Sequence, residues 1–257
     1  MAPVWEEKAG SFERGRVLAE HAAARGSDLV VFPETTLTGF SMKATSLAEP
    51  AADAPTIRAF ADLARELRLA IAFGVVLHGR TRPTNSMVVV DRTGAEIARY
   101  AKIHPFTFAG EDAHYESGER TAVAAVDDVV FGLSICYDLR FPELYTAVAE
   151  RVHALLVIAN WPEPRVPHWL ALLQGRAIEN QCWVVGVNRT GEDGNGLHYP
   201  PSSRVHDPAG VQLAPEWREG ELEGHTITAE RVREQRRQFP VLGDRRPGLY
   251  REISSQP

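Results

Sequence analysis

The sequence predicts an α/β fold in a single domain spanning residues 1–257. Segments with the period of an amphipathic helix alternate along the chain with short apolar segments. This alternation is typical of helices packed in layers on sheets. No internal repeat, low-complexity segment or linker-like change of composition divides the chain, and 257 residues is within the range of one large α/β domain.

Five segments have helical periodicity. The first begins at Ser11 and ends at Gly26, a residue type that commonly terminates helices. The second has Pro55 in its first turn, where a missing backbone N–H costs no hydrogen bond. The expected helices cover residues 11–25, 54–69, 142–151, 167–180 and 229–239.

The strands are expected to be short, and several are continuous apolar runs typical of strands buried on both faces. Turn residues at Thr93-Gly94 and at 207–210 predict two hairpins. Residues 102–119 have no clear period, and a long irregular segment in a compact domain is usually functional. The expected strands cover 28–32, 69–77, 86–91, 96–100, 129–136, 154–159, 182–187, 204–207, 211–214 and 224–228.

Composition and spacing exclude several classes of protein. The net charge of −6 without a basic patch argues against nucleic acid as a partner. The two cysteines and nine histidines show no metal-binding spacing, and no glycine pattern predicts a dinucleotide cofactor. No apolar run is long enough for a membrane span, and no signal peptide is recognisable. We expect a cytoplasmic protein with reduced thiols and no metal or cofactor.

Cys136 is the strongest candidate for a reactive group. It ends an apolar strand and is followed by a polar turn and then Pro142, which opens a helix. A strand–turn–helix junction exposes the side chain and places backbone N–H groups beside it, as an oxyanion hole requires. The alternative is a small buried apolar residue, and this is the interpretation we adopt for Cys182, which lies inside an apolar run.

Glu34 and Lys102 are candidates of a different kind. Glu34 directly follows the buried strand 28–32, and ligand sites of α/β proteins gather at the carboxyl ends of strands. Lys102 lies at the start of the irregular segment. Taken alone, Glu34 is as easily explained as an acid on a surface loop, and Lys102 is better explained as a solvated charge.

Three segments together resemble the signature segments of the nitrilase, or carbon–nitrogen hydrolase, superfamily. They read FPETTLTGF (32–40), YAKIHPF (100–106) and GLSICYDLRFPELY (132–145), and the resemblance continues through 158–189 and 202–210. It implies a four-layer α-β-β-α sandwich and a catalytic triad of Glu34, Lys102 and Cys136. It also implies a homodimer or a higher homo-oligomer. Family chains begin with a strand that is absent before Met1 here, so we expect an exposed sheet edge and lower stability than in a chain extended upstream.

The resemblance also implies roles for further residues. A second glutamate follows the lysine in the family, for which Glu111 is our choice and Glu116 the alternative. In the implied mechanism, Glu34 takes the thiol proton, Cys136 forms a thioester, and Lys102 with the backbone N–H of Tyr137 stabilises the oxyanion.

The segment CYDLRFPE is similar to the amidase branches that include omega-amidase and the amidases of deaminated glutathione. Segments 159–169 and 176–196 look most like bacterial omega-amidases, which cleave the terminal amide of small carboxylated substrates. Another superfamily amidase, such as an N-carbamoyl-amine or deaminated-glutathione hydrolase, is the alternative, and an inactive binding module of the same fold is a second one. A substrate carboxylate needs a cation, and Arg140, Arg165 and Arg189 are the candidates. For Arg140 the preferred interpretation is structural, an ion pair with Asp138 or Glu143 that holds the turn, rather than a contact with the substrate. We expect Phe106, Trp161 and His168 to form the wall of the substrate pocket. The alternative is that the two aromatic residues belong to the core and that the histidine only begins a helix.

Overall fold

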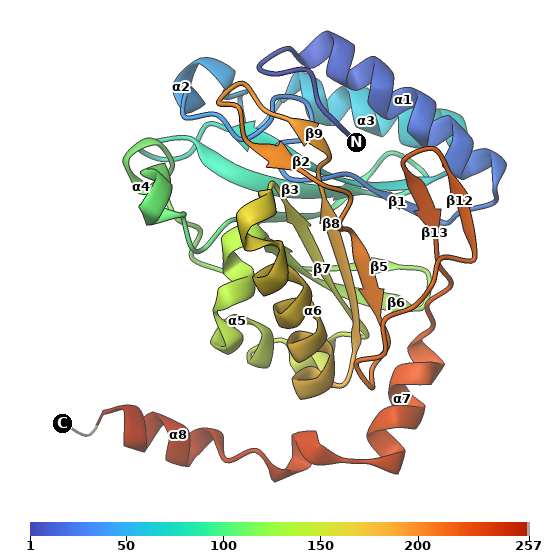
Figure 1. The fold of residues 1–257 in the computed structure, drawn as a ribbon, viewed down its shortest axis with the longest axis vertical. Coiled ribbons are helices and arrows are strands. Elements are labelled where there is room, and N and C mark those ends of the chain that lie inside the picture. Colours follow the sequence, from blue (N-terminus) through green and yellow to red (C-terminus); the bar gives the residue numbers. More distant parts are fainter. Residues whose placement is uncertain (256–257) are drawn as a thin grey trace.

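The structure, a computed structural model, describes residues 1–255. Two β-sheets lie face to face, and helices cover the outer face of each (Figure 1). The molecule is therefore a four-layer α-β-β-α sandwich, and the predicted fold class is confirmed.

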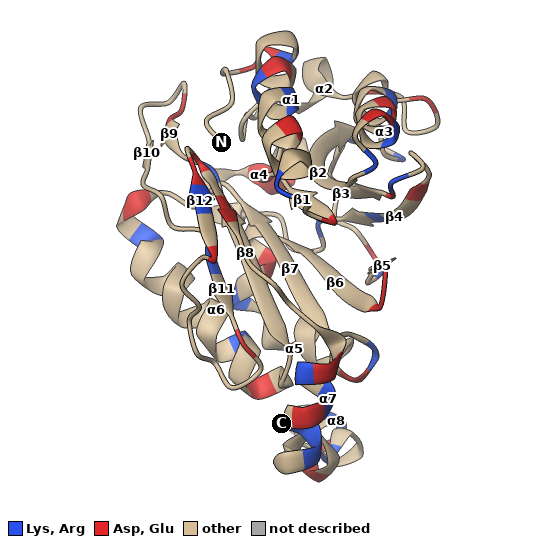
Figure 2. Cartoon of the chain, turned by 90° about the vertical axis from the view of Figure 1, so that its right-hand side faces the viewer, with Lys and Arg blue, Asp and Glu red and all other residues tan. Residues whose placement is uncertain are grey.

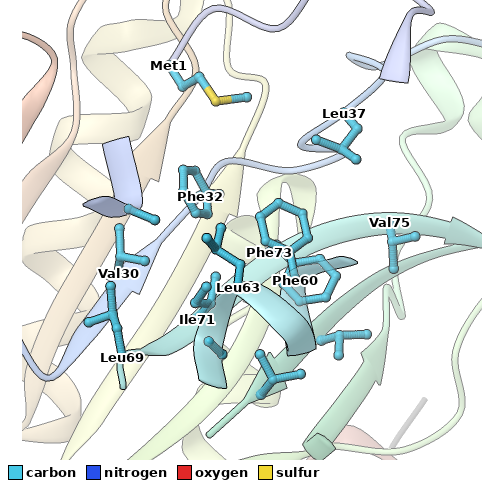
Figure 3. Close-up of a cluster of buried hydrophobic side chains, with 14 of the residues drawn as sticks. Met1, Val30, Phe32, Leu37, Phe60, Leu63, Leu69, Ile71, Phe73 and Val75 are labelled. Carbon is cyan, nitrogen blue, oxygen red and sulfur yellow. The ribbon is translucent and has the colours of Figure 1, made fainter. Parts of the chain in front are cut away.

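The first sheet has four strands in the order β1-β2-β3-β4, with β1 and β2 parallel and the other pairs antiparallel. Its outer face packs on helices α1 and α3, and the ring of Phe60 on α3 stacks on that of Phe73 on β2 with centroids 4.2 Å apart (Figure 3). The elements are α1 (Lys8–Ala24), β1 (Leu29–Val31), α3 (Pro55–Leu67), β2 (Ala70–Leu77), β3 (Thr84–Val90) and β4 (Glu96–Ala101).

The second sheet has five strands in the order β11-β8-β7-β6-β5. Its three central strands are parallel, and helices α5 and α6 cover its outer face around the buried Trp169. All six residues of β7 are buried, as its continuous apolar sequence predicts. The elements are β5 (Val123–Val126), β6 (Val129–Ile135), α5 (Pro142–Thr146), β7 (Ala154–Ala159), α6 (Val166–Asn180), β8 (Trp183–Asn188) and β11 (Arg204–His206).

Short elements occupy the connections. The irregular segment 102–119 forms two single turns of helix. The glycine-rich segment after β8 forms a hairpin whose two strands have two residues each. Near the C-terminus, α7 packs against the second sheet through the buried Val232, and α8 extends away from the sheets (Figure 1). These elements are α2 (Ala44–Leu47), α4 (Glu111–His114), β9 (Gly191–Glu192), β10 (His198–Tyr199), β12 (Trp217–Glu219), β13 (Leu222–Gly224), α7 (Ala229–Gln238) and α8 (Pro247–Ser254).

Several predicted boundaries are wrong. Helix α1 starts before Ser11, because Glu7 caps it: the Glu7 side chain accepts hydrogen bonds from the backbone N–H groups of Ala9 and Gly10 in the first turn. The helix expected over 142–151 ends at Thr146 and is followed by a separate 3₁₀ turn. Of the strand expected over 211–214, only Gln212 forms a bridge, and the last hairpin is β12–β13 rather than a strand over 224–228. Strand β5 was not predicted, because its four residues include two alanines and give little β signal.

Strand β1 pairs with β2 alone among the strands of residues 1–255, so the first sheet ends at β1. Met1 packs beside Phe32 in the core between this sheet and its helices (Figure 3). The lower stability expected for this edge stays a prediction. Acidic and basic residues are sparse on the strands of both sheets and gather on the helices and loops (Figure 2). Over the residues that are described, no helix has the length and apolar character to cross a membrane.

Candidate active site

Four polar side chains lie where strands of both sheets end. Glu34 follows β1, Cys136 follows β6 and Asn160 follows β7, all at the carboxyl ends of parallel strands. Lys102 follows β4 at the edge of the first sheet. Because the two sheets face each other, segments distant in the sequence meet at one end of the sandwich.

Lys102 is buried between two carboxylates. Its Nζ lies 3.0 Å from Oε1 of Glu34 and 2.8 Å from Oε2 of Glu111, and all three side chains are at most 2% exposed. An unpaired ammonium buried in a protein costs several kcal/mol, and two carboxylates at this distance offset that cost. The structure thus brings together three of the residues selected from the sequence.

Two asparagines hold the carboxylates in place. The Nδ2 of Asn85, at the start of β3, donates to Glu34 at 2.7 Å and to Glu111 at 3.0 Å. The backbone N–H of Asn160 donates to Oε2 of Glu34 at 2.8 Å, and the backbone N–H of Phe106 donates to Glu111. These donors compensate the net charge of −1 that two carboxylates and one ammonium leave in the interior.

Burial and charge act in opposite directions on these groups. Burial lowers the pKa of Lys102, but the carboxylates of Glu111 and Glu34 outweigh it and raise the pKa well above the usual value. Burial raises the pKa of Glu34, but the charge of Lys102 and the hydrogen bond from Asn85 outweigh it and lower the pKa. At neutral pH, Lys102 is therefore an ammonium and Glu34 an ionised carboxylate in the resting site.

Cys136 sits at a strained turn between β6 and a 3₁₀ turn over Cys136–Arg140. Its φ of 49° lies in the left-handed region, which is uncommon for a residue with a Cβ. Its Sγ lies 3.9 Å from the carbonyl oxygen of Asn160, the residue whose N–H binds Glu34. Burial and the nearby carboxylate of Glu34 raise the pKa of the Cys136 thiol well above its usual value, so the resting thiol keeps its proton.

Tyr137 follows Cys136 in the first turn of this 3₁₀ segment. The first N–H groups of a helical turn have no acceptor within the turn. The Tyr137 N–H is therefore available beside the thiol, and its role as an oxyanion donor stays a prediction.

A cavity opens onto the thiol. Its volume is about 80 Å³, and its wall is mainly aromatic and apolar with cationic side chains. The space suits a short substrate. The lining residues are Phe40, Lys102, Phe106, Ala109, Cys136, Tyr137, Arg140, Asn160, Trp161, Pro162, Arg165, Leu197 and Tyr199.

The three arginines selected from the sequence differ in their surroundings. Arg140 and Arg165 line the cavity, where Arg140 lies over the Trp161 ring at 4.9 Å and Arg165 over the Phe106 ring at 5.3 Å. Arg189 does not line the cavity: it is 1% exposed, lies over the ring of Tyr199, and donates to the carbonyls of its own loop.

The ion pair considered for Arg140 is not formed. The carboxylate of Asp138 is occupied by Tyr100, Ile135 and His104, and Glu143 is exposed on the first turn of α5. Within residues 1–255, no carboxylate pairs with Arg140 or Arg165, so both guanidinium groups keep their charge facing the cavity.

Of the residues expected to wall the pocket, Phe106 and Trp161 do so and His168 does not. His168 is exposed near the start of α6, and its Nδ1 lies 3.4 Å from Arg140. It therefore contacts the Arg140 guanidinium without lining the cavity itself.

The alternative glutamate has a different environment. Glu116 accepts hydrogen bonds from the backbone N–H groups of Arg80, Thr81 and Arg82 in the β2–β3 connection. It makes no contact with Lys102 among the described interactions, whereas Glu111 does. The geometry favours Glu111 as the second glutamate.

Three residues of the site were missed from the sequence. Asn160 directly follows a buried strand. The same signal selected Glu34, so Asn160 could have been predicted from the sequence. Asn85 lies at the start of an apolar strand, and no pattern distinguishes it there. Tyr199 comes from the glycine-rich loop, and only the fold brings it to the cavity, where its hydroxyl donates to Asp193.

Comparison with known proteins extends this picture. The carbon–nitrogen hydrolase family model matches residues 1–240. The chain is 34% identical to omega-amidase YafV of Escherichia coli (strain K12), with 85% of this chain and 84% of that protein covered. It is 34% identical to a 2-oxoglutaramate amidase of Paenarthrobacter nicotinovorans, with 87% of this chain and 80% of that protein covered.

A solved structure is also similar. This structure is XC1258 from Xanthomonas campestris, a CN-hydrolase superfamily protein with an arsenic adduct in its active site. The two structures superpose with a TM-score of 0.88, and the sequences are 35% identical, with 95% of this chain and 94% of that chain covered. We conclude that the chain belongs to the carbon–nitrogen hydrolase family and is a hydrolase acting on carbon–nitrogen bonds.

Proposed function

We propose that this hydrolase is an amidase that cleaves the terminal amide of a small carboxylated substrate, for example 2-oxoglutaramate to 2-oxoglutarate and ammonia. Relatives named omega-amidase and 2-oxoglutaramate amidase support the reaction. The observation that carries the substrate class is the pair Arg140 and Arg165, two guanidinium groups that face a small, mainly apolar cavity and have no carboxylate partner among residues 1–255.

The chemistry follows from the charges of the site. As Sγ of Cys136 attacks the amide carbon, its proton passes to the carboxylate of Glu34, because the net negative charge nearby disfavours a free thiolate. The negative oxygen that forms is stabilised by the ammonium of Lys102 and the N–H of Tyr137. Glu111 holds Lys102 in place and keeps it protonated.

The tetrahedral intermediate then collapses to a thioester. Glu34 gives its proton to the departing nitrogen, and ammonia leaves. Glu34 next takes a proton from a water molecule, the resulting hydroxide attacks the thioester carbon, and the carboxylic acid product leaves as the proton returns to Sγ of Cys136. Each proton taken is given back, so the enzyme is regenerated.

The experiment is an ammonia-release panel. We expect 2-oxoglutaramate and succinamate to be cleaved fastest, ahead of deaminated glutathione, an N-carbamoyl amino acid, a simple nitrile and butanamide, which lacks the carboxylate. Cys136→Ala should abolish release. Preferred turnover of the N-carbamoyl compound or of butanamide would refute the proposed substrate class, and full activity of Cys136→Ala would refute the mechanism.

The two arginines can be tested separately. We expect Arg140→Leu and Arg165→Leu each to raise KM for succinamate by about 10- to 100-fold, the range of one charge-assisted pair, and to leave kcat/KM for butanamide unchanged. Arg151→Leu is the control, because Arg151 is exposed in a 3₁₀ turn outside the cavity. Equal losses on both substrates would show that the arginines serve the fold rather than the carboxylate.

We also propose a cytoplasmic homodimer or higher homo-oligomer. Both cysteines are unpaired, which suits a reducing compartment. Phe239, Tyr250 and Ile253 of the C-terminal segment are each more than half exposed, which leaves apolar surface for a second copy. Light scattering would test assembly, and a monomer at micromolar concentration would contradict it.

A further inference from the structure

The carboxylate of Asp138, two residues after the thiol, has no role in the mechanism above. It is fully buried, and both of its oxygens accept hydrogen bonds. Oδ2 accepts from the hydroxyl of Tyr100 at 2.8 Å and from the N–H of Ile135 at 2.9 Å. Oδ1 accepts from the backbone N–H of His104 at 3.0 Å and lies 2.8 Å from its Nδ1.

These partners come from the two segments that carry the reacting groups. Tyr100 and His104 lie two residues before and two residues after Lys102, on the first sheet and its following loop. Ile135 is the residue directly before Cys136, on the second sheet. A single carboxylate therefore joins the segment of the ammonium to the segment of the thiol.

The turn that carries the thiol needs such support. Cys136 has a left-handed backbone, which the chain adopts only when the surroundings hold it there. The bond from the Ile135 N–H to Asp138 closes this turn at its start. On the other side, the His104 ring stacks on that of Phe141 with centroids 3.9 Å apart, so the Lys102 segment is also packed against the end of the same turn.

We infer that Asp138 is a positioning residue that fixes the Lys102 ammonium relative to the Cys136 thiol through Tyr100, His104 and Ile135. The inference rests on the proposed function, since it assigns Lys102 and Cys136 the roles given above. A displacement of about 1 Å between reacting groups can lower a rate by about 100-fold, and the substrate-binding arginines are not among the partners of Asp138. Loss of the carboxylate should therefore affect kcat far more than KM.

The test is Asp138→Asn, with Glu49→Gln as the matched control. Glu49 is also a buried carboxylate with several donors, from Lys8 and Thr56, and it lies outside the cavity lining. We expect Asp138→Asn to lower kcat for succinamate by about 100-fold while KM changes by less than about threefold, and to slow alkylation of Cys136 by iodoacetamide. Glu49→Gln should lower Tm without changing kcat or the alkylation rate.

A second pair of variants keeps the test decisive if Asp138→Asn does not fold. Tyr100→Phe and His104→Ala each remove one donor to Asp138 and should lower kcat with KM retained. Where Asp138→Asn does fold, adding Tyr100→Phe to it should lower kcat by less than Tyr100→Phe does in the wild type, because both changes disturb the same hydrogen bond. Wild-type kcat in Tyr100→Phe and His104→Ala, or equal changes in kcat and KM, would overturn the inference.

The outcome is separable from that of the proposed function. If the wild-type protein releases ammonia from no amide of the panel, the proposed function fails, and the alkylation rate of Cys136 still decides the role of Asp138. If the wild type is an amidase and Asp138→Asn alkylates and turns over at the wild-type rate, the inference alone fails.

Discussion

Asn160 binds Glu34 through its backbone N–H at 2.8 Å and through its side-chain Nδ2 at 3.2 Å, although 126 residues separate them. Glu34 follows β1 of the first sheet and Asn160 follows β7 of the second, so these bonds fix the proposed general base to the sheet that carries the thiol. The carbonyl oxygen of the same asparagine lies 3.9 Å from the Cys136 sulfur. The distance between the proposed base, Glu34, and the proposed nucleophile, Cys136, thus depends on how the two sheets pack.

This contact predicts the effect of Asn160→Asp. The variant places a carboxylate against Glu34, and like charges at this distance raise the pKa of a carboxyl group. Because Glu34 must be ionised to take the thiol proton, the acid limb of the kcat/KM profile should move to higher pH. Asn180→Asp is the control, since Asn180 is buried at the end of α6 away from the cavity and should lose stability without shifting the profile. An unshifted profile in Asn160→Asp would contradict the assignment of Glu34 as the base.

A second prediction concerns Glu111. Glu111→Gln removes one of two carboxylates that keep Lys102 charged in a buried position. With less compensation, burial lowers the pKa of the lysine, and the oxyanion loses part of its stabilisation. We expect kcat to fall by about 100-fold, the effect of losing one such group. Asp112→Asn, an exposed neighbour in α4, should leave kcat unchanged, and the same result for Glu111→Gln would remove Glu111 from the mechanism.

How much of this site was predictable depends on whether a local pattern marks a residue. Glu34 and Cys136 each follow an apolar strand, and such a position can be recognised from one stretch of sequence. Arg140 is different: its partner Trp161 comes from the end of another strand, so the ion pair suggested by the nearby Asp138 and Glu143 was the wrong reading.

The same distinction holds for the fold. Alternating helices and strands predicted an α/β protein, and the resemblance supplied the four layers. The glycine-rich loop gave no sign that Tyr199 reaches the cavity, because only long-range packing brings it there. Strand β5 was not predicted because its short, alanine-containing sequence has little strand propensity. It pairs with β6 through backbone hydrogen bonds, which its side chains do not reveal.

A third prediction tests Glu116 as a structural residue. Burial raises its pKa, but hydrogen bonds from the backbone of Arg80, Thr81 and Arg82 outweigh burial and lower the pKa to about 2. A lowered carboxyl pKa gives stability that is present above the unfolded value of about 4.3 and is lost as the pH falls toward 2. Glu116→Gln should therefore lower Tm at pH 7 by roughly 2–4 °C, the shift that about 1 kcal/mol produces in a large domain.

The difference in Tm between wild type and Glu116→Gln should shrink as the pH falls from 5 to 2, with kcat unaffected at pH 7. Glu119→Gln is the control, since Glu119 is exposed and pairs only with Arg80 on the surface. A Glu116→Gln variant that folds as stably as wild type but loses turnover would instead make Glu116 the second catalytic glutamate.

The last prediction concerns Gly74, in the middle of β2. A Cβ at this position would lie 2.3 Å from the backbone nitrogen of Thr35, whose φ is 45°, and 2.9 Å from Cα of Glu34. The backbone N–H of Gly74 also donates a hydrogen bond to the hydroxyl of Thr36 at 2.8 Å. The strand therefore touches the loop that carries Glu34, the proposed general base, and Gly74→Ala must displace this loop. Overpacking of this kind costs about 1–3 kcal/mol, and kcat should fall with it.

Gly175→Ala is the matched control. Gly175 lies within α6, and nothing stands within 4 Å of the position of its added Cβ. Replacing it should stabilise the protein by roughly 0.5–1 kcal/mol, because alanine loses less backbone entropy than glycine in a helix. Urea unfolding and ammonia release should be measured on both variants. If Gly74→Ala retained wild-type stability and turnover, the loop at Glu34 would be free to move without loss of function, and the proposed dependence of catalysis on its fixed position would be wrong.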